Sequence, residues 1–185
     1  MESAVATHSH VATKKPAVRL VRADVTMLEV DAFVFYAQPD LALGSGFGGA
    51  IAVRGGASIQ KELNELAAHG PVPVGSAVVT KGGKLKAPQI IHAVGPRFKE
   101  ADTEGKLRKT VLACLEAAEE HGVKTLAFPL MGSGYYGVPP AVSSRVMLEA
   151  FESHGARGTG LQEITVCVFD TPQFQAFSAA QAARS

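Results

Sequence analysis

The sequence has no tryptophan, only two cysteines and almost no net charge, and each shortage excludes a class of protein. Lys and Arg together number 18 against 17 Asp and Glu. This balance argues against a protein that coats the nucleic-acid backbone, so a nucleic-acid partner is unsupported. No apolar run approaches the ~20 residues of a membrane-spanning helix, and the N-terminus lacks the apolar centre of a signal peptide. We therefore expect a cytoplasmic protein without membrane contact.

The two cysteines, Cys114 and Cys167, lie in apolar periodic segments and have no metal-ligand spacing. Buried, unreactive thiols are the expected outcome. His8 and His10 are too isolated to indicate a metal. The sequence therefore predicts neither a metal site nor a bound cofactor.

The chain has the length and the 46% hydrophobic content of one compact domain. Residues 1–16 are polar and show no periodicity, so we expect a flexible N-terminal tail followed by a single domain over 17–185.

Short apolar runs alternate with helical patterns through the domain. Strands are expected at 17–22, 31–37, 76–80, 89–94, 124–128 and 163–169. Helices are expected from the 44–52 segment to about Ala68, over 103–121 and 139–154, and from Thr171, with Thr171 as N-cap and Pro172 at the first helical position. This alternation predicts an α/β fold, a three-layer α/β/α sandwich.

Two glycine-rich segments each join an apolar strand to a helix. Residues 128–139 read F-P-L-M-G-S-G-Y-Y-G-V-P, and residues 44–52 read G-S-G-F-G-G-A-I-A. Glycines let successive N–H groups turn toward one point, and the following helix adds its N-terminal dipole, so each segment suits a phosphate. A connecting turn is the alternative for either segment alone. The pair favours a ligand with two adjacent phosphates at the sheet rim, with nearby aromatic residues available for a base or sugar.

Residues 44–52 also satisfy G-x-G-x-x-G, through Gly44, Gly46 and Gly49. In a dinucleotide-binding Rossmann unit these glycines follow the first strand directly, whereas here residues 38–43 intervene. The acidic residues that follow, Glu62 and Glu65, lie in a helical pattern. Dinucleotide-dependent redox chemistry is therefore the least favoured interpretation.

Two polar residues have more than one interpretation. Asp24 is placed either to cap a short turn or to face a ligand. His92 lies inside an apolar strand, which favours a core histidine over a catalytic base.

Five segments, in order, resemble motifs of the macro domain family, whose members bind ADP-ribose. Residues 23–26 resemble G-D-I-T, 30–38 resemble V-D-A-I-V-N-A-A-N, 44–51 resemble G-G-G-V-x-G-A-I, 91–96 resemble I-H-T-V-G-P, and 128–139 resemble F-P-x-[IM]-[SG]-[ST]-G-x-[FY]-G-x-P. The resemblance covers nearly the whole chain and implies a mixed, largely parallel central sheet. It also implies free ADP-ribose or an ADP-ribosylated protein as the partner.

The resemblance assigns a ligand role to particular residues. Asp24 would accept from the adenine amino group with help from the Val25 amide, and Phe169 would lie against the adenine face. Tyr136 would pack against the distal ribose. The diphosphate would be held between Gly46, Phe47 and Gly48 on one side and Ser133, Gly134 and Tyr135 on the other.

The departures from the family pattern concern catalysis. Gln38 stands where hydrolytic members have the distal-ribose Asn, and Gly48 stands where many have a water-positioning Asp. Neither can act as a base. A reader that binds ADP-ribose is therefore favoured. The alternative is a hydrolase of ADP-ribosyl linkages or of ADP-ribose 1″-phosphate, in which the attacking water is positioned by one of the candidate catalytic residues, Gln38 or Asp40, or by the ligand's own diphosphate.

Overall fold

The computed structural model describes residues 14–185, so most of the expected tail lies outside the described residues. The strands are β1 (Ala17–Arg22), β2 (Ala32–Ala37), β3 (Ser76–Lys81), β4 (Gln89–Val94), β5 (Thr125–Pro129) and β6 (Glu163–Val168). The helices are the 3-10 turn η1 (Val25–Met27), α1 (Phe47–Gly55), α2 (Ala57–Leu66), α3 (Thr103–Glu120), α4 (Pro140–Ala156) and α5 (Thr171–Ala182).

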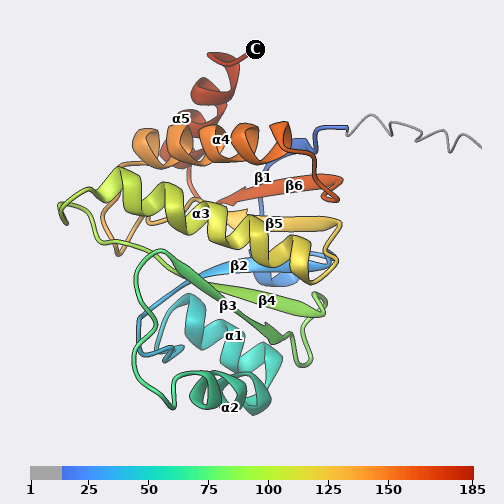
Figure 1. Cartoon of the computed structure of the whole chain (residues 1–185), viewed down its shortest axis with the longest axis vertical. Helices are drawn as coiled ribbons and strands as arrows, with labels where there is room; N and C mark the ends of the chain where they lie inside the picture. The colour runs from blue at the N-terminus through green and yellow to red at the C-terminus, as the bar shows by residue number, and fades with distance from the viewer. Residues whose placement is uncertain (1–13) are drawn as a thin grey trace, which may run out of the picture.

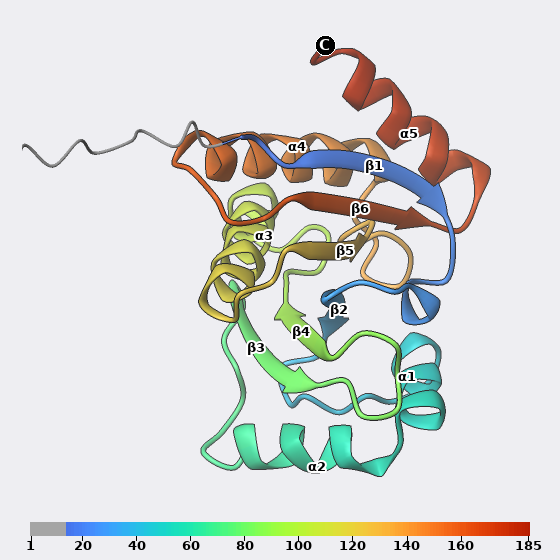
Figure 2. The ribbon, with the colours of Figure 1, turned by 90° about the vertical axis from the view of Figure 1, so that its right-hand side faces the viewer.

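The strands form one mixed sheet in the order β1-β6-β5-β2-β4-β3, in which only the β3–β4 pair is antiparallel. Figures 1 and 2 show α3 and α4 packed on one face of this sheet, and α1 and α2 beside its other face. The predicted three-layer α/β/α sandwich with a largely parallel sheet is confirmed. Among residues 14–185, no helix is both long enough and apolar enough to span a membrane.

Strand β2 supplies both layers of the core because its side chains alternate between the two faces. Val34 and Tyr36 join the cluster beneath α3 and α4, whereas Phe33 joins the cluster beneath α1 and α2. A strand covered on both faces explains the continuous apolar run of the sequence.

Asp31 closes the amino-terminal end of the sheet. Its Oδ2 accepts hydrogen bonds from the backbone N–H groups of Lys124 (2.8 Å) and Thr125 (3.0 Å), which fixes the start of β2 beside the start of β5. The parallel strands are thus aligned so that their carboxyl ends share the opposite edge, where the glycine-rich segments lie.

Two predicted boundaries are wrong. The single helix expected to reach Ala68 is divided at Gly56, whose φ of +91° belongs to the left-handed region and interrupts the helix between α1 and α2. The N-cap of α5 is Asp170, whose carboxylate accepts from the Gln173 amide at 2.8 Å, and Thr171 is the first helical residue.

Candidate functional site

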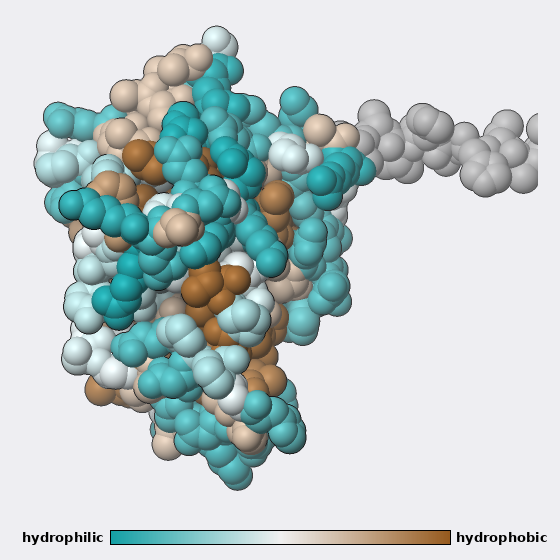
Figure 3. All heavy atoms as spheres, turned by 60° about the vertical axis from the view of Figure 1, so that its left-hand side comes forward, coloured by the Kyte–Doolittle hydropathy of each residue, from teal (hydrophilic) through white to brown (hydrophobic). Residues whose placement is uncertain are grey.

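A cavity of about 500 Å³ opens at the carboxyl ends of β2, β5 and β6. Figure 3 brings this end of the molecule forward and shows hydrophobic residues gathered near the middle, bordered by hydrophilic ones. Most of the predicted ligand-binding residues line it: Val25, Gln38, Gly46, Phe47, Gly48, Ser133, Gly134, Tyr135, Tyr136 and Phe169. Asp24 and Asp40 do not line it. The fold therefore brings the two glycine-rich segments together around one space.

Both segments present backbone N–H groups that the fold leaves unused. Within residues 14–185, the amides of Phe47 and Gly48 at the start of α1, and those of Gly134, Tyr135 and Tyr136, donate to no protein acceptor. Free amides at a helix N-terminus and in a glycine-rich turn attract anions without a charged side chain.

The second segment takes its shape from glycines in the left-handed region. Gly132, Gly134 and Gly137 have φ of +73°, +88° and +77°. A hydrogen bond from the Gly137 amide to the Gly134 carbonyl (2.9 Å) closes a tight turn. The amides between those two glycines, those of Tyr135 and Tyr136, have no acceptor among residues 14–185, and both residues line the cavity.

Gly48 lies where no side chain fits. A Cβ placed on it would lie 1.6 Å from the carbonyl oxygen of Leu43, so the 41–43 backbone occupies that space. Leu41 is buried with a φ of +59°, an uncommon conformation for a leucine. The carboxylate that the resemblance associates with hydrolysis is thus excluded here by packing.

Gln60 of α2 holds this backbone in place. Its Oε1 accepts from the Leu43 amide (3.0 Å), and its Nε2 donates to the Leu41 carbonyl (3.3 Å). Sequence reasoning missed this residue, because a glutamine in an amphipathic helix normally faces water.

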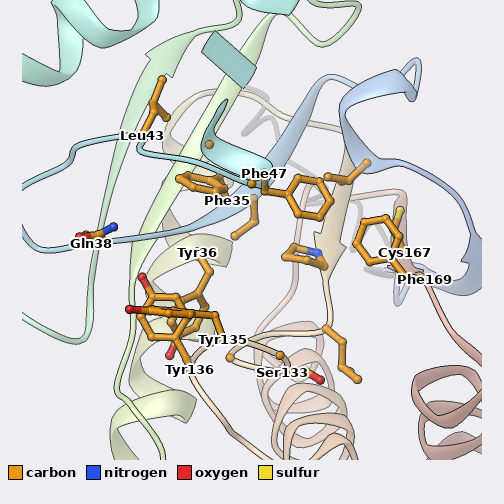
Figure 4. Close-up of a pocket in the computed structure, with 18 of the residues that line it drawn as sticks. Phe35, Tyr36, Gln38, Leu43, Phe47, Ser133, Tyr135, Tyr136, Cys167 and Phe169 are labelled. Atoms are coloured by element: carbon orange, nitrogen blue, oxygen red, sulfur yellow. The ribbon is translucent and has the colours of Figure 1, made fainter. Parts of the chain in front are cut away.

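Two aromatic rings meet at one end of the cavity. The Phe47 and Phe169 ring centroids are 5.0 Å apart at an interplanar angle of 51°, and Figure 4 shows both rings facing the space near Cys167. Phe169 remains 58% exposed, so one of its faces is available to a planar ligand.

Gln173 connects the Phe169 segment to the second glycine-rich segment. Its Oε1 accepts from the Phe169 amide (3.0 Å), and its Nε2 donates to Ser133 Oγ (3.1 Å). Gln173 lines the cavity and was not predicted, since nothing in its helical context distinguishes it.

Asp24 caps η1, one of its two expected roles. Its Oδ1 accepts from the amide (3.0 Å) and hydroxyl (2.7 Å) of Thr26, and its Oδ2 accepts from Arg54 of α1 at 2.5 Å. Burial raises the pKa of the Asp24 carboxyl, but the hydrogen bonds from Thr26 and Arg54 outweigh it, so the net pKa is lowered. The group is an anion at neutral pH, beside the cavity-lining Val25.

Cys167 was expected in the core, and it is buried, yet it also lines the cavity. Burial raises the pKa of its thiol to about 12, so it is a neutral, weakly reactive group.

Tyrosines form the opposite end of the cavity. Tyr36 is buried and donates to the Pro96 carbonyl at 2.5 Å, and its ring centroid is 4.5 Å from that of Tyr136. Burial raises the pKa of both phenols, so they stay protonated. Figure 4 shows Gln38 apart from this group, and Gln38 is exposed. Asp40 caps its own turn by accepting from the Ala42 amide (3.0 Å).

His92 is a core residue, as its apolar strand indicated. Its Nε2 lies 2.9 Å from Thr80 Oγ1, its Nδ1 has no partner, and burial lowers its pKa to about 3. The imidazole is therefore neutral, and it does not reach the cavity. No cluster of His, Cys, Asp or Glu within residues 14–185 has the arrangement of a metal site.

The fold and the cavity define a class of protein: an α/β/α sandwich with a cavity between two glycine-rich loops at the carboxyl ends of parallel strands. A family model of the Macro domain matches residues 36–147, and the chain belongs to that family.

Its relatives agree with this membership. The chain is 34% identical over 169 residues to a macro domain-containing protein of Caldanaerobacter subterraneus subsp. tengcongensis, covering 90% of this chain and 96% of that one. It is 29% identical to O-acetyl-ADP-ribose deacetylase 1 of Pantoea vagans, covering 86% of this chain and 95% of that one. The Trypanosoma brucei macrodomain in complex with ADP-ribose superposes with a TM-score of 0.79 at 26% identity, covering 89% and 68% of the two chains.

Proposed function

We propose that this chain is a reader that binds ADP-ribose, free or attached to a protein, and does not cleave it. The observation that carries the proposal is the pairing of two sets of unused amides across one cavity of about 500 Å³. Such a site suits a diphosphate because fixed dipoles replace its hydration shell.

The cavity's two ends suit the two ends of this ligand. In the proposed pose adenine stacks on Phe169, with its amino group directed toward the Asp24 carboxylate. The distal ribose packs on Tyr136, in the same cavity that Gln38 lines. The related macrodomain solved with ADP-ribose supports this choice of ligand.

The lining argues against hydrolysis that depends on a protein base. The side chains that line the cavity include no carboxylate, imidazole or amine, and the Cys167 thiol is protonated at neutral pH. General acid–base catalysis requires a group that can take a proton from water, within hydrogen-bond reach. The relative named O-acetyl-ADP-ribose deacetylase keeps a hydrolase as the second candidate.

Binding is tested by calorimetry with ADP-ribose on a matched pair of variants, Gly134→Val and Gly122→Val. Both glycines have positive φ, and neither has an atom within 4 Å of a built Cβ, so the backbone strain is comparable. Only Gly134 faces the cavity. We expect Gly134→Val to abolish measurable binding and Gly122→Val to retain it, although the two variants have similar melting temperatures. Absence of binding by the unmodified protein would falsify the proposal.

Turnover separates the reader from the hydrolase. The protein is incubated with O-acetyl-ADP-ribose, ADP-ribose 1″-phosphate and a mono-ADP-ribosylated protein, and free ADP-ribose is measured. We expect none above the uncatalysed rate. Release that Gln38→Ala abolishes would instead establish a hydrolase.

A further inference from the structure

Arg97 stands outside the cavity, at its tyrosine end. Its guanidinium carbon lies 5.4 Å from the ring centroid of Tyr135 and 5.5 Å from that of Tyr136. Both tyrosines line the cavity, and Tyr135 is 80% exposed. Figure 4 shows the two rings grouped with Tyr36, at the end opposite Cys167 and Phe169. A ligand that fills the cavity and continues past Tyr136 meets this arginine.

The charge of Arg97 is not neutralised by the protein. Within residues 14–185, no carboxylate lies within 4.0 Å of its guanidinium, whereas Arg54 is paired with Asp24 at 2.5 Å. The adjacent Glu100 accepts from the Arg97 backbone amide (3.2 Å), and its other oxygen pairs with Lys106 (3.5 Å). The stacked guanidinium therefore keeps its N–H donors for a group outside the protein.

The backbone that carries Arg97 is fixed to the cavity wall on both sides. The Pro96 carbonyl accepts from the Tyr36 hydroxyl at 2.5 Å, and the Phe98 amide donates to the Tyr136 carbonyl at 2.9 Å. The guanidinium rests on two aromatic faces of that same wall. Its position is thus set before a ligand arrives, which lowers the entropy lost on binding.

We propose that Arg97 is a specificity-determining residue that selects ligands carrying a phosphate on the distal ribose. The proposal rests on the proposed function, because the pose of ADP-ribose directs that ribose toward Tyr136. A guanidinium suits a phosphate better than a neutral substituent because its parallel N–H groups match two phosphate oxygens. Asp40 opposes this preference, since its negative charge acts on Tyr136 from the same end.

The test compares the affinities of ADP-ribose and ADP-ribose 1″-phosphate by calorimetry at low salt. We expect the unmodified protein to favour the phosphate about fivefold, a modest ratio because Arg97 is exposed to water. Arg97→Gln should remove the preference while leaving the affinity for ADP-ribose within about twofold. Asp40→Asn retains the oxygen that accepts from the Ala42 amide and should increase the preference for the phosphate. Lys61→Gln is the control: like Arg97→Gln it removes one positive charge, but on α2 and away from the cavity lining, and the preference for the phosphate should remain.

The outcomes distinguish two failures. If the unmodified protein does not bind ADP-ribose, the proposed function fails. If it binds both ligands equally, or if Arg97→Gln keeps the preference, only the role of Arg97 is refuted.

A further arm uses ADP-ribose joined through its distal ribose to the 5′-phosphate of a trinucleotide. If the protein also binds this conjugate more tightly than ADP-ribose, and Arg97→Gln removes the difference, the end of a nucleic acid is identified as the source of the phosphate. A preference confined to ADP-ribose 1″-phosphate identifies a terminal phosphate.

Discussion

Gly48→Ala tests whether the Phe47 and Gly48 amides, which the proposed pose assigns to the diphosphate, depend on close backbone packing. The new Cβ would lie 1.6 Å from the Leu43 oxygen and 2.5 Å from its carbonyl carbon, whereas ordinary contacts begin near 3.4 Å. The 41–43 backbone must therefore move away from α1. Because Gln60 holds that backbone through two hydrogen bonds, the movement breaks or stretches both.

The magnitude follows from two opposing terms. Overpacking costs about 1–3 kcal/mol, and replacing a helical glycine by alanine returns up to about 1 kcal/mol. Because the new Cβ would lie only 1.6 Å from a backbone oxygen, the cost lies in the upper part of that range, and the net loss is about 1–2 kcal/mol. In a domain of this size such a loss lowers the melting temperature by about 2–8 °C. Displaced amides at Phe47 and Gly48 should also weaken ADP-ribose binding at least about tenfold, the loss of one charge-assisted hydrogen bond.

Gly49→Ala is the matched control. Gly49 is the next residue of the same helix, and its Cβ would meet only the Gly44 carbonyl oxygen at 3.4 Å, an ordinary contact. We expect an unchanged or raised melting temperature and an affinity within about twofold of the unmodified protein. The assays are thermal unfolding and calorimetry with ADP-ribose. Equal effects of the two substitutions, or a Gly48→Ala protein that matches the unmodified one, would refute the packing argument.

Three further expectations concern other parts of the molecule. Asp24→Ala should weaken ADP-ribose binding about ten- to a hundredfold by calorimetry, since a charge-assisted hydrogen bond to adenine is worth ~1.5–3 kcal/mol; unchanged affinity in a folded variant would place the adenine elsewhere. Gln60→Leu should weaken ADP-ribose binding but leave adenosine binding unchanged, because only the phosphate-facing backbone loses its support; equal losses for both ligands would contradict this. Burial raises the pKa of Glu119, but its hydrogen bonds to Thr159, His154 and the Gly160 amide outweigh this and lower the pKa below 4.5. The ionised Glu119 carboxylate therefore stabilises the fold above pH 4.5, and this stabilisation is lost as the pH falls. Between pH 6 and about pH 3, the melting temperature should fall less in Glu119→Gln than in the unmodified protein. An equal fall in both proteins would exclude a stabilising role of the Glu119 carboxylate.

The sheet and the glycine-rich loops could be predicted because their signals are local. The continuous apolar run of β2 indicates a strand that is buried on both faces, and the glycines after β5 indicate residues with left-handed backbone conformation. The sequence carries a signal for the division at Gly56, because the Gly55-Gly56 pair is a dipeptide that marks breaks. The division was missed because the apolar periodicity on both sides was interpreted as one continuous helix. The α5 N-cap was misplaced by one residue, since Asp170 and Thr171 are both good caps.

The unpredicted residues of the site depend on contacts between distant segments. Gln173 acts through Ser133, 40 positions away in the chain, and no spacing rule connects them. The role proposed for Arg97 depends on its contacts with Tyr135 and Tyr136, which belong to another loop. Periodicity describes an element's own environment, whereas these roles arise from how elements meet.

The buried ring of Tyr36 restricts what its neighbours can become. A Cβ on Gly95 would lie 2.2 Å from the Tyr36 hydroxyl oxygen, and one on Gly132 would lie 3.3 Å from it. Substitutions at these positions are therefore not independent. As long as Tyr36 is kept in evolution, position 95 must remain glycine. Position 95 can accept other residues only after Tyr36 has been replaced by a residue without a ring.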